Sequence, residues 1–430
     1  MTDARPIDQS RRRMDRRDLL AIAFVYLALA LLIGPRTPYG KWNVSPKFET
    51  LGQNIALAET MAWREGHLSL DEDFYEDAEF NGKTYSVVGL AFTIISVPIT
   101  WIADLLGCAT HFPRPVYFLL MTIPIPIVAY LSIRRFVSSP AWAALLSIGF
   151  VCGTPMGPEI GSCYTGNIYD INHVIAVTGV FLIAADLLGA RRIWPAAIGL
   201  ILSCWSRQMT CLYSAPLLLI AWRATSVRSS AGPALSADAT TPRRYRPIAF
   251  AVLGIAIAGG IPLTLNYLKF GNPLDTGYVH LYADRTDPIA ERARSALFSV
   301  RYLWMHLRAM HLDFAPWDIR HGKLHIDIVD VIGGSLWLTT PLTIGIFLTV
   351  RRWWKDIDAR ILVLGTIPVI IGLHLYHTTG GPPGMYRYAL DFLPIWWLAI
   401  APATESSPQA KRVTVAAVAY SVLYYAVLHW

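Results

Sequence analysis

Short clusters of arginine and lysine separate a series of apolar segments, and their placement constrains the fold more than any other feature of this chain. Lysine and arginine are retained on the cytoplasmic side of a membrane when they lie in short loops. We therefore expect all the clusters on one side and the intervening polar segments on the other. The clusters lie at residues 11–17, 134–135, 191–192, 223–246, 351–355 and 411–412.

Composition agrees with a membrane protein, because 54% of the residues are hydrophobic and only 16% are charged. The net charge of +7 is accounted for by the basic clusters. No nucleic-acid partner is needed to explain it, and the expected environment is a lipid bilayer.

The apolar runs predict an all-α polytopic membrane protein of about eleven transmembrane helices. Residues 1–18 are expected to form a cytoplasmic basic N-terminus and residues 19–430 the transmembrane domain. Residues 35–114 and 269–330 are expected as large outer loops, and 223–247 as a cytoplasmic linker. The predicted spans are roughly 19–34, 115–133, 140–155, 171–189, 194–206, 208–222, 248–268, 331–350, 361–376, 388–403 and 413–429.

Two segments do not fit a simple alternation of spans. If 85–107 crossed the membrane, every later basic cluster would lie outside, so we expect this segment to lie along or dip into the outer leaflet. Residues 194–222 are too short for two full crossings, yet both flanks are basic. A short hairpin with its tip near Arg207 satisfies the charge rule.

Five segments, in order, resemble the GT-C superfamily of polytopic glycosyltransferases, above all its bacterial protein-mannosyltransferase-like members. The most specific are Asn266 to Tyr278 (NYLKFGNPLDTGY) and Gly384 to Pro394 (GMYRYALDFLP). The resemblance implies juxtamembrane helices in the first outer loop. It also implies inverting transfer of a hexose or pentose from a polyprenyl-phosphate donor. The other three segments are 48–68, 77–86 and 153–173.

The resemblance further implies an inner (plasma) membrane protein with its N-terminus in the cytoplasm and its active site on the periplasmic side. The acceptor would be an envelope lipid, glycan or protein. These expectations agree with the topology that the basic clusters predict.

Two carboxylates are candidates for the catalytic base, which would deprotonate the acceptor hydroxyl. The family's acidic motif after the first span is absent here, where Trp42 to Ser45 (WNVS) stands instead. Glu49 is the nearest carboxylate, and Asp77 is the alternative because it lies in a matched segment. Either residue can also be read as a solvated acid. A second family motif, Asp-Lys-x-Pro-Gly after Ser86, is replaced by Val87-Val88-Gly89.

Arg207, Arg387 and Tyr388 are the candidates for binding the donor phosphate. A guanidinium at membrane depth is costly and usually faces a cavity or a partner, and its fork geometry suits a phosphate. The competing interpretations are a structural ion pair between Arg207 and a loop acid, and an i,i+4 pair between Arg387 and Asp391.

Four further residues are candidates for substrate binding. Asp170 and His173 stand three apart and share one helical face. Asp275 and Tyr278 follow a Gly-Asn-Pro turn, and the alternative is that they only shape this turn. No cofactor is required by the sequence. A divalent ion (Mg or Mn) at Asp170 and His173 would need more carboxylates. For the histidine-rich residues 301–330 we favour an amphipathic helix over a zinc site.

Two other functions stay open. A lipid-linked-sugar flippase or transporter would also use arginines at membrane depth, but it would need no catalytic base. A non-catalytic GT-C-like assembly subunit would tolerate replacement of both Glu49 and Asp77.

Overall fold

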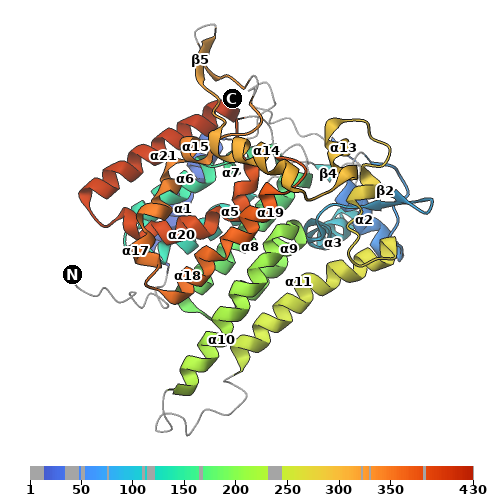
Figure 1. Cartoon of the computed structure of the whole chain (residues 1–430), viewed down its shortest axis with the longest axis horizontal. Coiled ribbons are helices and arrows are strands. Elements are labelled where there is room, and N and C mark those ends of the chain that lie inside the picture. The colour runs from blue at the N-terminus through green and yellow to red at the C-terminus, as the bar shows by residue number, and fades with distance from the viewer. Residues whose placement is uncertain are drawn as a thin grey trace.

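The computed structural model is a largely helical bundle (Figure 1). The predicted basic N-terminus up to residue 13, and residues 231–244 of the predicted linker, lie outside the described residues. The described residues are 14–33, 48–49, 54–74, 77–108, 112–113, 122–163, 168–230, 245–320, 323–328, 331–380 and 384–429.

The longer helices form the bundle, with α21 on one flank and α9, α10 and α11 on the other (Figure 1). Their bounds are α1 Arg16–Leu32, α2 Ile55–Glu65, α3 Leu90–Leu105, α5 Pro124–Arg134, α6 Pro140–Cys152, α7 Met156–Ser162, α8 Ile168–Ala185, α9 Trp194–Ser206, α10 Ser214–Ser230, α11 Arg246–Phe270, α18 Ile357–Leu364, α19 Thr366–His374, α20 Leu393–Thr404 and α21 Pro408–His429. Shorter helical pieces are η3 Asp186–Ala190, η4 Gln208–Tyr213, α12 Tyr278–Leu281, α13 Pro288–Ser295, η7 Val300–Tyr302, α14 Leu303–Leu307, η8 Arg308–Leu312, α15 Leu336–Thr339, η9 Pro341–Ile344, α16 Gly345–Leu348, α17 Val350–Trp353 and η10 Arg387–Asp391.

Among the described residues, four helical segments are long and apolar enough to cross a membrane: Ile168–Ala190, Arg246–Phe270, Ile357–His374 and Pro408–Leu428. A fifth is added if α6 and α7, bent by 63° at their junction, form one broken span. The predicted count of about eleven spans is not confirmed. In the predicted span 331–350, the chain is broken into α15, η9, α16 and α17, because Pro341 lacks a backbone donor and Thr339, Thr340 and Thr343 bond backbone carbonyls.

Three short antiparallel β-pairs were not expected in an all-α protein. β2 (Asp77–Phe80) and β3 (Lys83–Ser86) form a hairpin whose turn residues Asn81 and Gly82 both have positive φ. An Asn-Gly pair between short strands is a strong hairpin signal, so the sequence did contain this element. β1 (Phe48–Glu49) pairs with β4 (Phe112–Pro113). β5 (Trp317–Arg320) pairs with β6 (Lys323–Ile326), which replaces the second half of the helix expected over 301–330.

The basic clusters meet at one end of the bundle, as the charge pattern predicted. Arg134 bonds Asp18 at the start of α1, at 2.9 Å, and both Arg191 and Arg223 contact Asp358, at 3.0 and 2.9 Å. We call this the basic end. Further contacts here join Arg135 to the Ala185 carbonyl, Ser138 to Glu405, and Lys411 to the ring of Trp142.

The predicted hairpin over 194–222 is confirmed by the same contacts. Residues 191 and 223 flank it and share Asp358, so α9 leaves the basic end and α10 returns to it. Arg207 lies at the break between α9 and η4, where its backbone is extended (φ −142°, ψ 104°). Thirteen helical residues rise about 20 Å, which places Arg207 at the opposite end of the bundle.

The helices between the two ends pack closely where glycines face each other. A Cβ added to Gly179 of α8 would lie 2.5 Å from the carbonyl oxygen of Gly199 in α9. Because only glycine permits this approach, α8 and α9 form a rigid pair. Their ends carry Asp170, His173 and Arg207.

The segment predicted to lie along the outer leaflet forms α3, with Pro98 inside the helix. α3 packs mainly against α2, joined by the 2.6 Å ion pair of Arg64 with Asp104 and by the hydrogen bond from Thr93 to Glu59. Its start meets α8, since a Cβ on Gly89 would lie within 3 Å of Asn172. α2 and α3 therefore gather at the end opposite the basic clusters (Figure 1).

Candidate functional site

A cavity of about 120 Å³ lies at the end of the bundle opposite the basic clusters, and we call this the cavity end. Six segments line it: α2, the start of α3, the α9–η4 break, the last turns of α11, the turn before α12, and the end of α19 with the chain after it. Its polar and aromatic lining residues include Glu59, Arg207, Asn266, Lys269, Tyr278 and Tyr376.

Arg207 lines the cavity, and its charge is compensated by a carboxylate. The guanidinium makes two hydrogen bonds of 3.2 Å to the two carboxylate oxygens of Asp391, and it lies 4.5 Å from the centre of the Tyr388 ring. The Arg207 side chain is 17% exposed and that of Asp391 1%. A two-pronged pair of this kind holds the guanidinium in one orientation. The competing interpretation of a structural ion pair is thus observed, but the acid is Asp391 of η10, in the predicted span 388–403, and not an acid of an outer loop.

Arg387 is also largely buried, with its side chain 16% exposed, but its partner is not the one that the spacing suggested. Its Nη1 atom lies 3.1 Å from Asp170 and 3.8 Å from Glu159. The expected pair with Asp391 does not form, because 387–391 is the 3₁₀ helix η10, in which residues four apart do not share a face. Arg387 does not line the cavity.

Asp170 and His173 share one face of α8, as predicted, and both contact η10. Asp170 bonds Arg387, while the His173 ring stacks on Tyr388 with a centroid separation of 5.9 Å and an angle of 6°. His173 is buried, and neither of its ring nitrogens has a hydrogen-bond partner in the described part of the chain. The structure thus gathers Asp170, His173, Arg207, Arg387 and Tyr388 into one cluster beside the cavity.

A second ion pair in the cavity wall was missed by the sequence analysis. Lys269 donates to Glu59 at 2.5 Å and to the Ser86 carbonyl at 2.9 Å, and Thr93 donates to the other oxygen of Glu59 at 2.7 Å. Glu59 is 2% exposed. Lys269 lies in the segment Asn266 to Tyr278 that resembles the GT-C superfamily, so the sequence did point to this residue. For Glu59 the only signal was its position on the apolar face of α2, among Ile55, Ala56 and Ala62.

The structure does not place either predicted catalytic carboxylate among the described residues that line the cavity. The backbone of Glu49 pairs with Phe112, and its side chain is outside the described residues. Asp77 begins β2, where it accepts a 2.5 Å hydrogen bond from the Phe74 amide. It does not line the cavity.

Of the two residues after the Gly-Asn-Pro turn, one reaches the cavity. Asp275 accepts from the Gly277 amide at 2.8 Å and contacts His280 at 2.9 Å, so it shapes the turn. Tyr278 lines the cavity. A Cβ on Gly277, whose φ is +78°, would lie 2.4 Å from Val87, so glycine is required where the turn meets β3 and α3.

Two histidines near the cavity end are kept uncharged by burial. Burial lowers the pKa of His306 to about 4, and that of His377 likewise to about 4. His306 bonds the Tyr386 hydroxyl and the Tyr376 carbonyl, both at 2.8 Å. His311 is held between the Trp337 indole, which donates to its Nδ1, and His374. These contacts occupy the ring nitrogens of His306 and His311, while His321 lies outside the described residues and His325 is exposed on β6.

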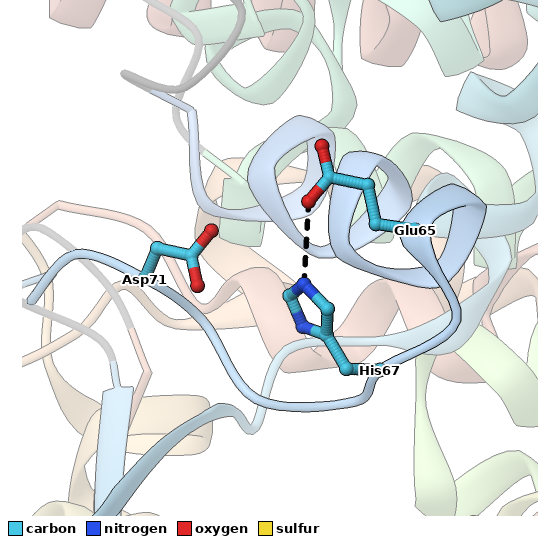
Figure 2. A group of neighbouring side chains, drawn as sticks. All are labelled: Glu65, His67 and Asp71. Carbon is cyan, nitrogen blue, oxygen red and sulfur yellow. Dashed lines mark hydrogen bonds and ion pairs between the residues drawn. The ribbon is translucent and has the colours of Figure 1, made fainter.

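Within the described residues, one group of side chains has metal-ligand spacing: Glu65, His67 and Asp71, whose ligand atoms lie within 4.8 Å of one another (Figure 2). His67 contacts the Ser69 carbonyl at 2.8 Å and Glu65 at 3.3 Å. These two contacts raise the pKa of His67, and protonation competes with metal binding. None of the predicted site residues belongs to this group.

No family model and no curated protein matches the sequence. Among solved structures, the chain is similar to the archaeal oligosaccharyltransferase AglB from Archaeoglobus fulgidus, determined in complex with an inhibitory peptide and a dolichol-phosphate. The match has 12% identity and a TM-score of 0.46, and it covers 96% of this chain and 55% of AglB.

The chain therefore spans about half the length of AglB. AglB is a GT-C glycosyltransferase, the class that the sequence motifs resemble. At this TM-score no residue, substrate or partner carries over, and the proposals below rest on the geometry of this chain.

Proposed function

We propose that this protein is a membrane glycosyltransferase that moves a sugar from a polyprenyl-phosphate donor to an envelope lipid, glycan or protein acceptor. The observation that carries the proposal is the composition of the cavity wall, where a carboxylate, Glu59, faces the same space as two cations, Arg207 and Lys269. Tyr278 and Tyr376 add aromatic surface on which a sugar ring can pack.

The reaction needs both kinds of charge. The acceptor hydroxyl attacks the anomeric carbon, its proton passes to a carboxylate, and the bond from that carbon to the phosphate oxygen breaks. The lipid phosphate leaves with the bonding electrons, so a nearby cation stabilises it. A single displacement of this kind inverts the anomeric centre. No step requires a metal ion.

In this proposal Glu59 is the base, because it is the carboxylate among the residues that line the cavity. Glu49 and Asp77 remain the alternatives for the base. Arg207 binds the donor phosphate from the α9–η4 break, and Lys269 pairs with Glu59 until the acceptor displaces the ammonium. Arg387, Asp170 and His173 support Arg207 through Tyr388 and η10.

The side of the membrane follows from the charge rule. The basic end is assigned to the cytoplasm, so the cavity end faces the periplasm and the N-terminus is cytoplasmic. The donor would then be used after its sugar has crossed the inner membrane.

The test is glycosyl transfer in proteoliposomes, with labelled polyprenyl-phosphate sugars and a crude envelope fraction as acceptor. We expect Glu59→Gln to lower transfer at least 100-fold, the lower range for general-base catalysis. Because this change leaves the buried Lys269 without its carboxylate, size-exclusion chromatography and retained donor binding check the fold. The charge-neutral pair Glu59→Gln with Lys269→Gln should lose transfer as well. Glu79→Gln, at an exposed position of the β2–β3 hairpin, is the matched control and should transfer normally.

Arg207 is tested with a charge-neutral pair, Arg207→Gln with Asp391→Asn, so that no buried charge is left alone. We expect this variant to fold and to lose donor binding. If Glu59→Gln transfers sugar as well as the wild type, and Asp77→Asn or Glu49→Gln loses transfer, then Asp77 or Glu49 is the base in place of Glu59. Donor binding with no transfer by the wild-type protein would favour the flippase or the non-catalytic subunit.

A further inference from the structure

A second hollow lies at the basic end, between α9 and α11, and it belongs to none of the sites described above. This groove has a volume of about 710 Å³. Its floor is the contact of Gly254 with Ala197, where an added Cβ would lie 2.7 Å from the Ala197 Cβ. Its apolar walls include Ile198, Ile201, Leu253 and Ile257.

Three arginines close one end of the groove: Arg191, Arg192 and Arg246. Arg191 is neutralised by its ion pairs with Asp356 and Asp358, at 2.9 and 3.0 Å. Neither Arg192 nor Arg246 forms an ion pair with a carboxylate of the described chain, and both are exposed. The residues that line the groove include no acid. Asp186 accepts a hydrogen bond from the Arg192 amide at 3.1 Å, but neither guanidinium makes an ion pair within the described residues, so two exposed cations stand at the mouth of the apolar groove.

The groove opens on the lateral surface of the bundle, which would face the lipid. Only 17% of the most apolar stretch of α11 is buried within the protein, and Ile198 and Leu253 are 44% and 56% exposed. From Arg246 to Ile257 the helix rises about 16 Å. This matches one leaflet, because half of a hydrocarbon core of about 30 Å is about 15 Å.

We propose that this groove binds an anionic glycerophospholipid from the leaflet at the basic end. Its headgroup phosphate contacts Arg192 and Arg246, and an acyl chain lies between α9 and α11. A basic pocket between membrane helices favours an anionic headgroup, and the one-leaflet length favours a phospholipid over a much longer polyprenyl chain. The bound lipid braces the two helices that carry Arg207 and Lys269 at their far ends.

The test uses the full chain in detergent, with phosphatidylglycerol and phosphatidylcholine of identical acyl chains as probes and native mass spectrometry to count bound lipid. We expect phosphatidylglycerol to bind at least fivefold more tightly. Arg192→Gln and Arg246→Gln should each weaken its binding about fivefold, the fold-change that about 1 kcal/mol per basic residue near an anionic surface implies. Ile201→Trp, which fills the groove, should weaken the binding of both lipids.

Arg412→Gln is the matched control, since Arg412 is exposed in α21 and does not line the groove. It should change binding less than twofold. Size-exclusion chromatography and thermal melting check that each variant is folded. If Arg246→Gln does not fold, Arg192→Gln still tests the proposal, because Arg192 is exposed. Equal binding of both lipids, or equal loss in Arg412→Gln, would overturn the proposal. So would displacement of phosphatidylglycerol by equimolar polyprenyl phosphate.

Discussion

At the cavity end Arg207 and Arg387 lie buried against carboxylates, whereas at the basic end Arg192 and Arg246 stand exposed with no carboxylate partner in the described residues. The physical cause is the cost of removing a charge from water, which is several kcal/mol for an uncompensated ion. A buried arginine therefore needs its own acid. An exposed arginine does not, and its charge stays available to lipid headgroups.

In the two proposals, the ends of the bundle would bind an anion in different ways. At the cavity end a donor phosphate would compete with Asp391 for Arg207. At the basic end a lipid headgroup would meet two exposed guanidinium groups.

The largest effect is expected from Asp391→Asn. The change leaves the buried Arg207 guanidinium without a countercharge, which typically costs about 3–5 kcal/mol. The measurement is the thermal melting temperature in detergent. Arg192→Gln is the matched control at the basic end and should change stability by less than about 0.5 kcal/mol. Equal melting shifts for the two variants would show that the paired arginine at the cavity end and the exposed arginine at the basic end do not differ in their need for a carboxylate.

Acidic pH should lower the stability of the folded protein through the buried histidines near the cavity end. The pKa of His306 in the folded protein is about 4, below the ordinary value of about 6.5. Between these values the unfolded chain binds a proton that the folded chain does not. Stability is therefore present above pH 6.5 and falls toward pH 4, by up to roughly 3 kcal/mol.

The measurement for this prediction is melting as a function of pH, with His306→Gln expected to flatten the profile. His325→Gln, on the exposed strand β6, should leave it as in the wild type. A profile that is equally steep in His306→Gln would show that another group carries the acid sensitivity.

A smaller loss is expected where the helices that join the two ends pack through glycine. Gly179→Ala places a Cβ 2.5 Å from the Gly199 carbonyl, and overpacking of this kind costs about 1–3 kcal/mol. Gly260→Ala is the control, because nothing lies within 4 Å of its added Cβ. It should be neutral or stabilise by at most about 1 kcal/mol. A neutral Gly179→Ala would mean that α8 and α9 move apart easily.

The smallest effect is expected at the exposed pair of Arg191 and Asp356, whose side chains are 39% and 45% exposed. Asp356→Asn removes the charge but keeps the cap of α18, where Asp356 accepts from two backbone amides. It should cost at most about 1 kcal/mol and depend on salt. Asp356→Ala also loses the cap, for about 1 kcal/mol more. Equal losses in the two variants would assign the stability to the ion pair and none of it to the cap.

The sequence by itself determined much of the organisation. The basic clusters predicted a common end of the bundle, and the ion pairs at Asp18 and Asp358 bear this out. They also predicted the hairpin with Arg207 at its tip. Clusters of charge and the periodicity of apolar residues are patterns within short stretches of chain, so a single sequence is enough to recognise them. Asn81-Gly82 was an equally local signal of a hairpin.

Only the tertiary structure decided which charges meet. Arg207 lies 184 residues from Asp391, Arg387 lies 217 from Asp170, and Lys269 lies 210 from Glu59. Nothing local in the chain encodes these partners, because they depend on how the helix ends are brought together. The 3₁₀ turn of η10 directed Arg387 to Asp170 and left Asp391 to Arg207. In the same way, the place of Glu59 in the cavity wall follows from the packing of α2 against α3 and from its ion pair with Lys269 of α11, and this arrangement makes Glu59 the candidate base.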